Sequence, residues 1–446
     1  MTTVMEIPRF RFAFHPADIP HIGHLHSAAF AWALARAQGG DFILRLDGAG
    51  MGETESGEEM VDALNWLGLD WDEGPGVGEQ TAASTQQRQR GERYQELAET
   101  LVARGKAAYR DDLGGGRSLR LLLPEDEPIV VEDALRGPLR FEVESLPDTE
   151  PLLVSPEGAP SAYLTSVVDD QDMEISHVVQ DGESLLTVPF QVALYRALGW
   201  EPPTYVHVPV IKREADPVAG ARPLFADEFQ EAGYLPEALF NYLLLLGWSP
   251  EEEIFGRWEV RRNLTLDAIS AEPVTFDWQR LNRINRHHIN EKSDKALSTL
   301  IRPYLADAYG LTDVNEAWLQ RLTAVIRPEI VRLADAVHLA EWALADFFTF
   351  TPEAEAALEM ETTRPALVRL VAELARIVLL DVPTATTILD ALKRDLSSPE
   401  GSDARVEKPI RAALTGRLGS ASLAEIMALL GAARCMNRAA DILRGA

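Results

Sequence analysis

Residues 10–36, FRFAFHPADIPHIGHLHSAAFAWALAR, decide how the rest of the chain is interpreted. The aromatic and apolar run at 10–14 is typical of a buried strand, and the two prolines within 15–20 indicate a turn. An apolar helix is then expected to open at His21 and to stop at the glycine pair 39–40. Because a helix N-terminus presents unpaired backbone N–H groups, this strand, loop and helix together suit the binding of a phosphate.

Two histidines flank a glycine where that helix begins. His21 and His24 could donate hydrogen bonds to a phosphate in its transition state without adding a permanent charge. Gly23 lacks a side chain and would let a ligand approach the backbone closely. These three residues are the predicted catalytic residues. The pattern H-x-G-H is short, however, and two solvated or helix-capping histidines are the alternative interpretation.

Length and composition bound the class of protein. The chain has 446 residues, of which 46% are hydrophobic and 25% charged, so two to four globular domains are expected. No signal peptide or membrane span is visible, and residues 1–8 lack the apolar run of a leader, so a cytoplasmic protein without membrane contact is predicted. The single cysteine, Cys435, excludes an intramolecular disulfide and a thiolate zinc cluster, so no zinc is expected.

The motif HIGH at 21–24 follows the first predicted strand and resembles the signature of class I aminoacyl-tRNA synthetases. Other segments resemble one family, the glutamyl-tRNA synthetases, along nearly the whole chain. In chain order, these segments are 65–75 (NWLGLDWDEGP), 131–138 (VEDALRGP), 167–178 (VVDDQDMEISHV), 233–248 (GYLPEALFNYLLLLGW) and 408–416 (KPIRAALTG). The resemblance implies the fold and the activity of that family.

The implied fold class is α/β plus all-α. A Rossmann-type catalytic core would be interrupted by an inserted acceptor-stem-binding domain and followed by helical stem-contact and α-helical anticodon-binding domains. Ala and Leu at helical spacing in the last third of the chain agree with the final domain. The expected boundaries are 8–110 for the first half of the core, 111–180 for a shortened insertion, 181–222 for the second half of the core, 223–302 for the stem-contact region and 303–446 for the anticodon-binding domain.

The implied activity is that of an ATP-dependent glutamate–tRNA ligase, which activates its amino acid by attack on the α-phosphate of ATP and transfers it to tRNA. The implied cofactors and partners are ATP, Mg²⁺ bound with the ATP, and a tRNA of the glutamate type, and a monomer is expected. The net charge of −28 opposes nucleic-acid binding at long range, although a local basic groove could still bind tRNA. Weaker tRNA binding than is usual for the family is therefore expected.

ATP binding is assigned to His21, His24, Lys212 and Arg213. In the family, a mobile loop of the form KMSKS also contacts ATP through its lysines. Here that loop falls at 216–220 (DPVAG), which holds no lysine and holds an aspartate that would repel phosphate. Lys212 and Arg213 lie close by in the sequence and could substitute, or they are plain surface charges. Losing a positioned donor typically costs about 3 to 4 kcal/mol, about 10²–10³ in rate, so slow adenylation is predicted.

The resemblance places the amino-acid pocket at Arg11, His15, Asp47, Tyr163 and Gln180. Arg11 matches the arginine that meets the substrate carboxylate in the family. His15 stands where the family has a serine, and Asp47 stands where it has a longer acid. Gln180 replaces a second substrate-binding arginine, whose bidentate fork suits a carboxylate, so glutamate should bind more weakly. Tyr163 lies one residue from the position of a family tyrosine and could fill part of its space.

Three acidic residues, Asp169, Asp170 and Asp172, could suggest a metal site. The family segment in which they lie has no such role, and a capped turn is the preferred interpretation. No metal site is therefore predicted. A basic cluster at 88–93 could touch an acceptor stem or could be a solvated helix face.

Three functions remain open on the sequence. The leading hypothesis is a glutamate–tRNA ligase homologue, a diverged paralogue whose activity is weakened or redirected by the lost lysines and pocket residues. The second is a catalytically inactive pseudo-synthetase that binds tRNA or a protein partner. The third is a repurposed ligase that adenylates a different acid, with or without tRNA.

Overall fold

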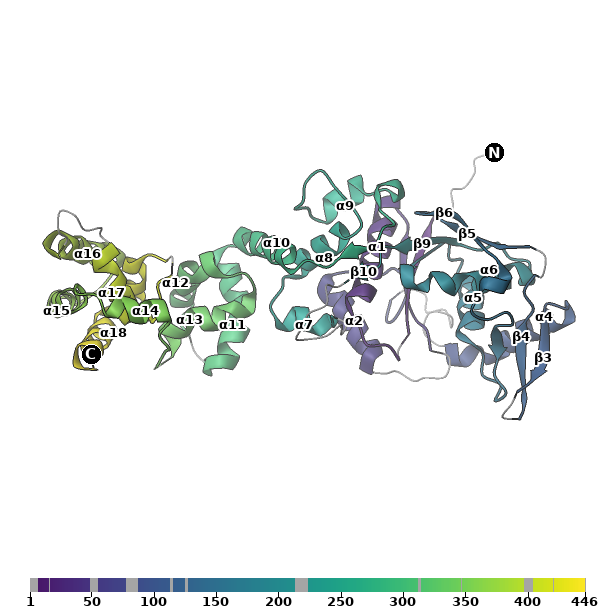
Figure 1. The fold of residues 1–446 in the computed structure, drawn as a ribbon, viewed down its shortest axis with the longest axis horizontal. Helices are drawn as coiled ribbons and strands as arrows, with labels where there is room; N and C mark the ends of the chain where they lie inside the picture. The colour runs from purple at the N-terminus through teal and green to yellow at the C-terminus, as the bar shows by residue number, and fades with distance from the viewer. Residues whose placement is uncertain are drawn as a thin grey trace. The chain divides into compact units, whose positions relative to one another are not determined.

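The chain forms two compact units, and each is described by itself (Figure 1). Unit 1 comprises Met1–Gln230 and Pro236–Ile284, and unit 2 comprises Glu231–Leu235 and Asn285–Ala446. In the computed structural model, the described residues are 7–15, 17–48, 55–77, 87–112, 115–124, 127–212, 224–311, 314–345, 347–396, 404–419 and 421–445.

Unit 1 is built on a six-stranded sheet with the strand order β2-β1-β8-β9-β5-β6. The first five strands in this order are parallel, and β6 pairs antiparallel with β5 at the edge. Their bounds are Asp41–Leu46 for β2, Arg9–Phe14 for β1, His177–Asp181 for β8, Thr204–Val208 for β9, Ile129–Asp133 for β5 and Gly137–Phe141 for β6. Parallel strands place their carboxyl ends at one edge, where sites of this architecture form.

Smaller sheets complete the β-structure described in unit 1. One is antiparallel and consists of β3 (Ala107–Asp111), β4 (Arg117–Leu121) and β7 (Leu152–Val154). The other pairs β10 (Ile211–Lys212) with β11 (Val274–Thr275). The range 111–180, predicted as an insertion, contributes strands both to the small sheet and to the main sheet. The predicted domain boundaries stay predictions.

Helices cover the main sheet and extend unit 1 (Figure 1). A short 3₁₀ turn, η1, leads directly into α4. The helices that begin in unit 1 are α1 (Ile22–Gln38), α2 (Glu55–Leu67), η1 (Gln87–Arg90), α4 (Gly91–Ala103), η2 (Val143–Ser145), α5 (Ala162–Asp172), η3 (Gly182–Leu186), α6 (Val188–Leu198), α7 (Ala226–Glu231), α8 (Pro236–Leu245), α9 (Arg257–Asn263), η4 (Leu266–Ala268) and α10 (Trp278–Glu291).

The regular secondary structure in the described residues of unit 2 consists of helices, as the Ala and Leu spacing predicts. Helix α18 packs against α15, α16 and α17, and α11 packs against α12 and α13. The bounds are α11 (Asp294–Tyr309), α12 (Glu316–Ile326), η5 (Arg327–Glu329), η6 (Leu333–Asp335), α13 (Ala336–Leu344), α14 (Pro352–Leu358), α15 (Thr363–Leu374), α16 (Val382–Leu396), α17 (Ala404–Thr415) and α18 (Leu423–Gly445). Across the described parts of both units, no helix has the length and apolar character that crossing a membrane requires.

The strand and the helix predicted for 10–36 are confirmed as β1 and α1, and the predicted turn lies between them. Phe10, Phe12 and Phe14 alternate along β1 and are buried, which is the two-residue period of a strand. Helix α1 ends at Gly39, whose left-handed φ of 65° favours glycine. A Cβ atom at residue 40 would lie 2.2 Å from the carbonyl oxygen of Pro8. Only a residue without a side chain therefore lets the chain come this close to the start of β1.

Helix α9 is tied to the rest of unit 1 by Arg257. Its guanidinium donates hydrogen bonds to the carbonyl oxygens of Leu67 and Gly68, where α2 ends. The same group lies 4.9 Å from the ring centroid of Trp32 and 5.0 Å from that of Phe240, so it also makes cation–π contacts. One side chain therefore caps α2 and packs between α1 and α8.

We expect Arg257→Ala to lower the free energy of unfolding by about 2 to 3 kcal/mol, because two carbonyls lose charged donors and two rings lose a cation. Urea unfolding of the full chain measures this change. The matched control is Arg261→Ala, an exposed arginine in the last turn of the same helix, which should change the unfolding free energy little. Equal destabilisation by the two substitutions would contradict the role of Arg257 as a clamp.

His26 is a buried polar residue inside α1. Its ring is fully buried against Phe30, and among the described residues neither ring nitrogen has a hydrogen-bond partner. Burial lowers the pKa of His26 from 6.5 to about 3. Below pH 6.5 the unfolded chain therefore binds more protons than the folded chain, and stability falls with falling pH by about 1.4 kcal/mol per unit until about pH 3.

We expect His26→Leu to reduce the acid sensitivity of the fold. Between pH 7 and pH 5 the wild type should lose about 2 kcal/mol of unfolding free energy through His26, and the variant should lack this contribution. Urea unfolding at both pH values gives the comparison. His338→Asn, at an exposed histidine of α13, should keep the loss of the wild type. An unchanged acid loss in His26→Leu would show that another group is responsible.

Candidate active site

The two histidines of the HIGH motif cap α1 reciprocally. His21 is the N-cap residue, with extended backbone, and its Nδ1 accepts a hydrogen bond from the backbone N–H of Gly23 at 3.1 Å. The Nδ1 of His24 accepts from the backbone N–H of His21 at 3.4 Å. The two ring centroids are 3.8 Å apart. The pair thus forms a capping box in which both side chains are imidazoles.

This cap determines which ring nitrogens carry protons. A backbone N–H can only donate, so both Nδ1 atoms are acceptors and each neutral ring carries its proton on Nε2. Burial lowers the pKa of His21, although the negative charges of Asp181 and Asp18 act to raise it. Burial and the neighbouring His21 lower the pKa of His24 to about 3. At neutral pH both rings are therefore uncharged, and each keeps an Nε2–H donor that the cap does not use.

Gly23 is required by the ring of His21. A side-chain carbon at residue 23 would lie 2.9 Å from Cε1 and 3.1 Å from Nδ1 of that ring. The sequence suggested that the glycine makes room for a ligand. In the fold its immediate role is to let the imidazole of the N-cap residue lie over the helix backbone.

A cavity of about 480 Å³ lies beside this helix end, at the carboxyl ends of β1 and β8. The five residues predicted for the amino-acid pocket all line it, together with His24 of the cap. These five are Arg11, His15, Asp47, Tyr163 and Gln180. The cavity is large enough for an amino acid, because small-molecule sites begin near 300 Å³.

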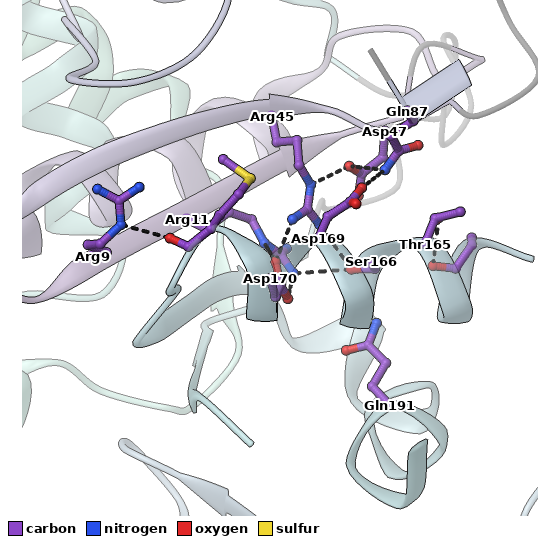
Figure 2. Close-up of polar contacts among 12 residues, drawn as sticks. Arg9, Arg11, Arg45, Asp47, Gln87, Thr165, Ser166, Asp169, Asp170 and Gln191 are labelled. Carbon is purple, nitrogen blue, oxygen red and sulfur yellow. Dashed lines mark hydrogen bonds and ion pairs between the residues drawn. The ribbon is translucent and has the colours of Figure 1, made fainter. Parts of the chain in front are cut away.

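Figure 2 shows two arginines and two aspartates in direct contact, a group called here the arginine–aspartate cluster: Arg11, Arg45, Asp47 and Asp170. Arg11 and Asp47 line the cavity, and Arg45 and Asp170 connect them. Arg11 pairs with both carboxylate oxygens of Asp170, at 3.0 and 2.6 Å. Arg45 pairs with Asp170 at 2.6 Å and with Asp47 at 2.5 and 3.2 Å. Burial alone would raise the pKa of Asp170, but the two guanidiniums hold it below its ordinary value. The four charges cancel.

A second layer of polar contacts surrounds Asp169. Its carboxylate accepts hydrogen bonds from Gln87 at 2.7 Å, from the hydroxyl of Tyr94 at 2.9 Å and from Arg90. Burial raises the pKa of Asp169 to about 6, although Arg45 and Arg90 oppose the shift. Figure 2 shows Asp169 on the same helix as Ser166, whose hydroxyl accepts from both arginines of the cluster.

The capped turn predicted around Asp169, Asp170 and Asp172 is wrong. All three lie in helix α5, which Ser161 caps at its start. Their carboxylates pair with arginines from other segments, and Arg90 and Arg93 of the basic cluster both contact Asp172. Within the described ranges, no group of three or more His, Cys, Asp or Glu side chains is arranged to hold a metal ion. The side chain at 88 lies outside the described residues.

Another polar chain crosses three neighbouring strands and ends at the cavity. Gln180 on β8 lies 2.9 Å from Nε2 of His207 on β9, and Nδ1 of His207 lies 2.5 Å from the carboxylate of Asp133 at the end of β5. His207 and Asp133 were not among the residues predicted for the site. The available signal was a histidine within the otherwise apolar run YVHV, which forms a buried strand.

The residues predicted to replace the lysine loop are only partly described. Lys212 is the last residue of β10, and its side chain is exposed. Arg213 and the loop at 216–220 lie outside the described residues. The assignment of Lys212 and Arg213 to ATP therefore stays a prediction.

Comparison with known proteins identifies relatives along the whole chain. The family model for the catalytic domain of class I tRNA synthetases (E and Q) matches residues 8–116 and 108–283, and an anticodon-binding-domain model matches 296–443. The chain is 32% identical to glutamate–tRNA ligase 2 of Rubrobacter xylanophilus, covering 98% of this chain and 97% of that protein. It is likewise 32% identical to the glutamate–tRNA ligase of Thermus thermophilus, over 96% and 98% of the two chains.

A solved structure shows the same fold. The crystal structure of a glutamate tRNA ligase from Elizabethkingia meningosepticum in complex with its amino acid superposes with a TM-score of 0.84, covering 99% of this chain and 100% of that one at 20% identity. The predicted Rossmann-type core and helical anticodon-binding domain are confirmed. Matched by the catalytic model from 8 to 283 and by relatives over nearly its full length, the chain belongs to the class I tRNA synthetase (E and Q) family.

Proposed function

We propose that this protein is a cytoplasmic aminoacyl-tRNA ligase that activates an amino acid with ATP and transfers it to tRNA. One observation carries the proposal. The histidine-capped N-terminus of α1 adjoins the cavity lined by the five pocket residues, and His24 belongs to both. A phosphate donor and an amino acid would therefore meet at His24. Family membership supports the same activity, which the relatives' names state for those proteins.

The cap suits the chemistry of adenylation. A carboxylate oxygen of the amino acid attacks the α-phosphorus of ATP, the bond from that phosphorus to the bridging oxygen breaks, and pyrophosphate leaves. Negative charge grows on the α-phosphate oxygens. The Nε2–H groups of His21 and His24, with the positive end of the α1 dipole, would stabilise this charge. Mg²⁺ would enter with the ATP phosphates, as this hard cation does when phosphates supply its ligands, and neutralise the pyrophosphate.

The cavity supplies the contacts for the amino acid. Among the described residues, Arg11 uses Nε and Nη2 for Asp170 and Ser166, which leaves Nη1 for a substrate carboxylate. His15, Asp47, Tyr163 and Gln180 would surround the remainder of the substrate. The tRNA, proposed to be of the glutamate type, would be held by the anticodon-binding domain matched at 296–443, with the protein acting as a monomer.

A second candidate function follows from the 216–220 segment. Its sequence, DPVAG, has no lysine to contact ATP. A pseudo-synthetase that binds tRNA or a protein partner without adenylation would have the same fold and cap. The two candidates differ in whether pyrophosphate is exchanged into ATP.

In the presence of tRNA, the wild type should exchange labelled pyrophosphate into ATP in response to an amino acid. His24→Ala should slow this exchange about 10²–10³-fold, because a donor to the developing charge is lost. His338→Asn in unit 2 is the control and should leave exchange unchanged. Silence of the wild type with all twenty amino acids would contradict the proposal, and retained tRNA affinity with a phosphate-dependent salt slope would then support the pseudo-synthetase.

Gly23→Ala should slow exchange about 10²-fold by displacing the ring of His21, since a misplacement of about 1 Å can have that effect. The added methyl group cannot fit 2.9 Å from Cε1 without moving the ring. Gly91→Ala is the matched control, at the start of α4, where an added side-chain carbon meets nothing within 4 Å. Normal exchange by Gly23→Ala would show that the position of His21 is not critical.

A further inference from the structure

The arginine and aspartate side chains that line the described cavity carry no net positive charge, although Arg11 is among them. The arginine–aspartate cluster holds two positive and two negative side chains in direct contact, and its charges cancel. Outside the cluster, the titratable residues that line the described cavity, apart from Tyr163, are two aspartates, Asp18 and Asp181, and two histidines, His15 and His24. A second substrate carboxylate would therefore be desolvated beside two acids, and the described lining offers it no lysine and no arginine other than Arg11, so its binding costs free energy.

The orientation of the Gln180 side chain decides which polar group the cavity presents to a ligand in place of a positive charge. It follows the buried strand residues of β8 and lines the cavity. Behind it, His207 and Asp133 are buried on the two neighbouring strands. The three side chains form a continuous chain from the sheet interior to the cavity.

The proton positions in this chain follow from its inner end. One oxygen of Asp133 accepts the backbone N–H groups of Leu135 and Arg136, at 2.9 and 2.8 Å. Although burial opposes it, hydrogen bonds from His207 and these backbone groups hold the pKa of Asp133 below its ordinary value, so the carboxylate is ionised. An ionised carboxylate only accepts, so Nδ1 of His207 donates to its other oxygen.

The outer end of the chain is then determined. An NH₂ group can only donate, so Nε2 of His207, which faces the amide nitrogen of Gln180, presents a lone pair. The amide NH₂ of Gln180 donates to that lone pair at 2.9 Å. The amide oxygen of Gln180 is left as a fixed acceptor at the cavity. An acceptor beside acidic neighbours matches a hydrogen-bond donor and repels a carboxylate.

We infer that the Asp133–His207–Gln180 chain makes the cavity select an amino acid whose side chain ends in an uncharged N–H or O–H donor over one that ends in a carboxylate. Gln180 contacts the substrate, and His207 and Asp133 are positioning residues. The inference rests on the proposed function, because it takes the cavity as the amino-acid site. It adds the class of amino acid that this site binds.

Glutamine and glutamate are a matched pair of probes, because they differ only in an amide NH₂ against a carboxylate oxygen. Calorimetric binding to the full-length protein should show glutamine binding about 10- to 100-fold more tightly than glutamate, since a buried acceptor facing a carboxylate leaves both groups unsatisfied. Asparagine, serine and norleucine, as further probes, separate amide, hydroxyl and apolar side chains. The apolar norleucine should bind more weakly than the donors.

Three variants test the mechanism. Gln180→Arg should invert the preference toward glutamate. Asp133→Asn should place an NH₂ group against Nδ1 of His207, shift the ring proton to Nε2 and rotate the Gln180 amide, so that the glutamine preference falls at least 10-fold. Imidazole ¹⁵N chemical shifts report this tautomer change, which a merely structural role would not produce. Gln95→Arg, on the exposed face of α4, is the control and should keep the wild-type preference.

The outcomes separate the inference from the proposed activity. A glutamine preference without pyrophosphate exchange would support the inference and contradict the activity. Exchange together with a glutamate preference would support the activity and overturn the inference. Binding of neither probe, or an unchanged preference in a folded Asp133→Asn protein whose tautomer has shifted, would also overturn it.

Discussion

The buried contact of Asp170 with two arginines is the constraint on which the site depends. Arg11 comes from β1, Arg45 from β2 and Asp170 from α5, so one carboxylate joins two strands to the helix above them. Removing one partner of such a group leaves an uncompensated buried charge and typically costs about 3 to 5 kcal/mol. The cluster therefore holds α5 against the sheet and positions Arg11 and Asp47 at the cavity.

The same constraint sets the electrostatics of the site. Because the cluster is internally neutral, the cavity cannot use the full charge of Arg11 to attract an anion. The cap of α1 is also built from uncharged groups, since burial keeps His21 and His24 neutral. Binding and catalysis would thus rely on directed hydrogen bonds in a low-dielectric site, where such donors are more effective than in water.

Fold and site are determined by different parts of the chain. The fold rests on apolar periodicity and on glycines at close contacts. Many different sequences can meet these two requirements. The site rests on a few polar side chains whose partners are also polar. Gln180 shows this division, because its backbone pairs with β9 in the sheet while its side chain contacts His207 and lines the cavity.

The sequence alone determined the strand, turn and helix at 10–36 and the histidine motif, because these follow from local periodicity, from glycine stops and from a contiguous motif. It predicted the synthetase architecture through the resemblance of several segments to a known family. Only the tertiary structure decided the partners of the charged residues. Arg11 and Asp170 are 159 residues apart, and Gln180 reaches Asp133 through His207 on a third strand. Such pairings leave no local pattern, because they depend on strand order and on which helix covers the sheet.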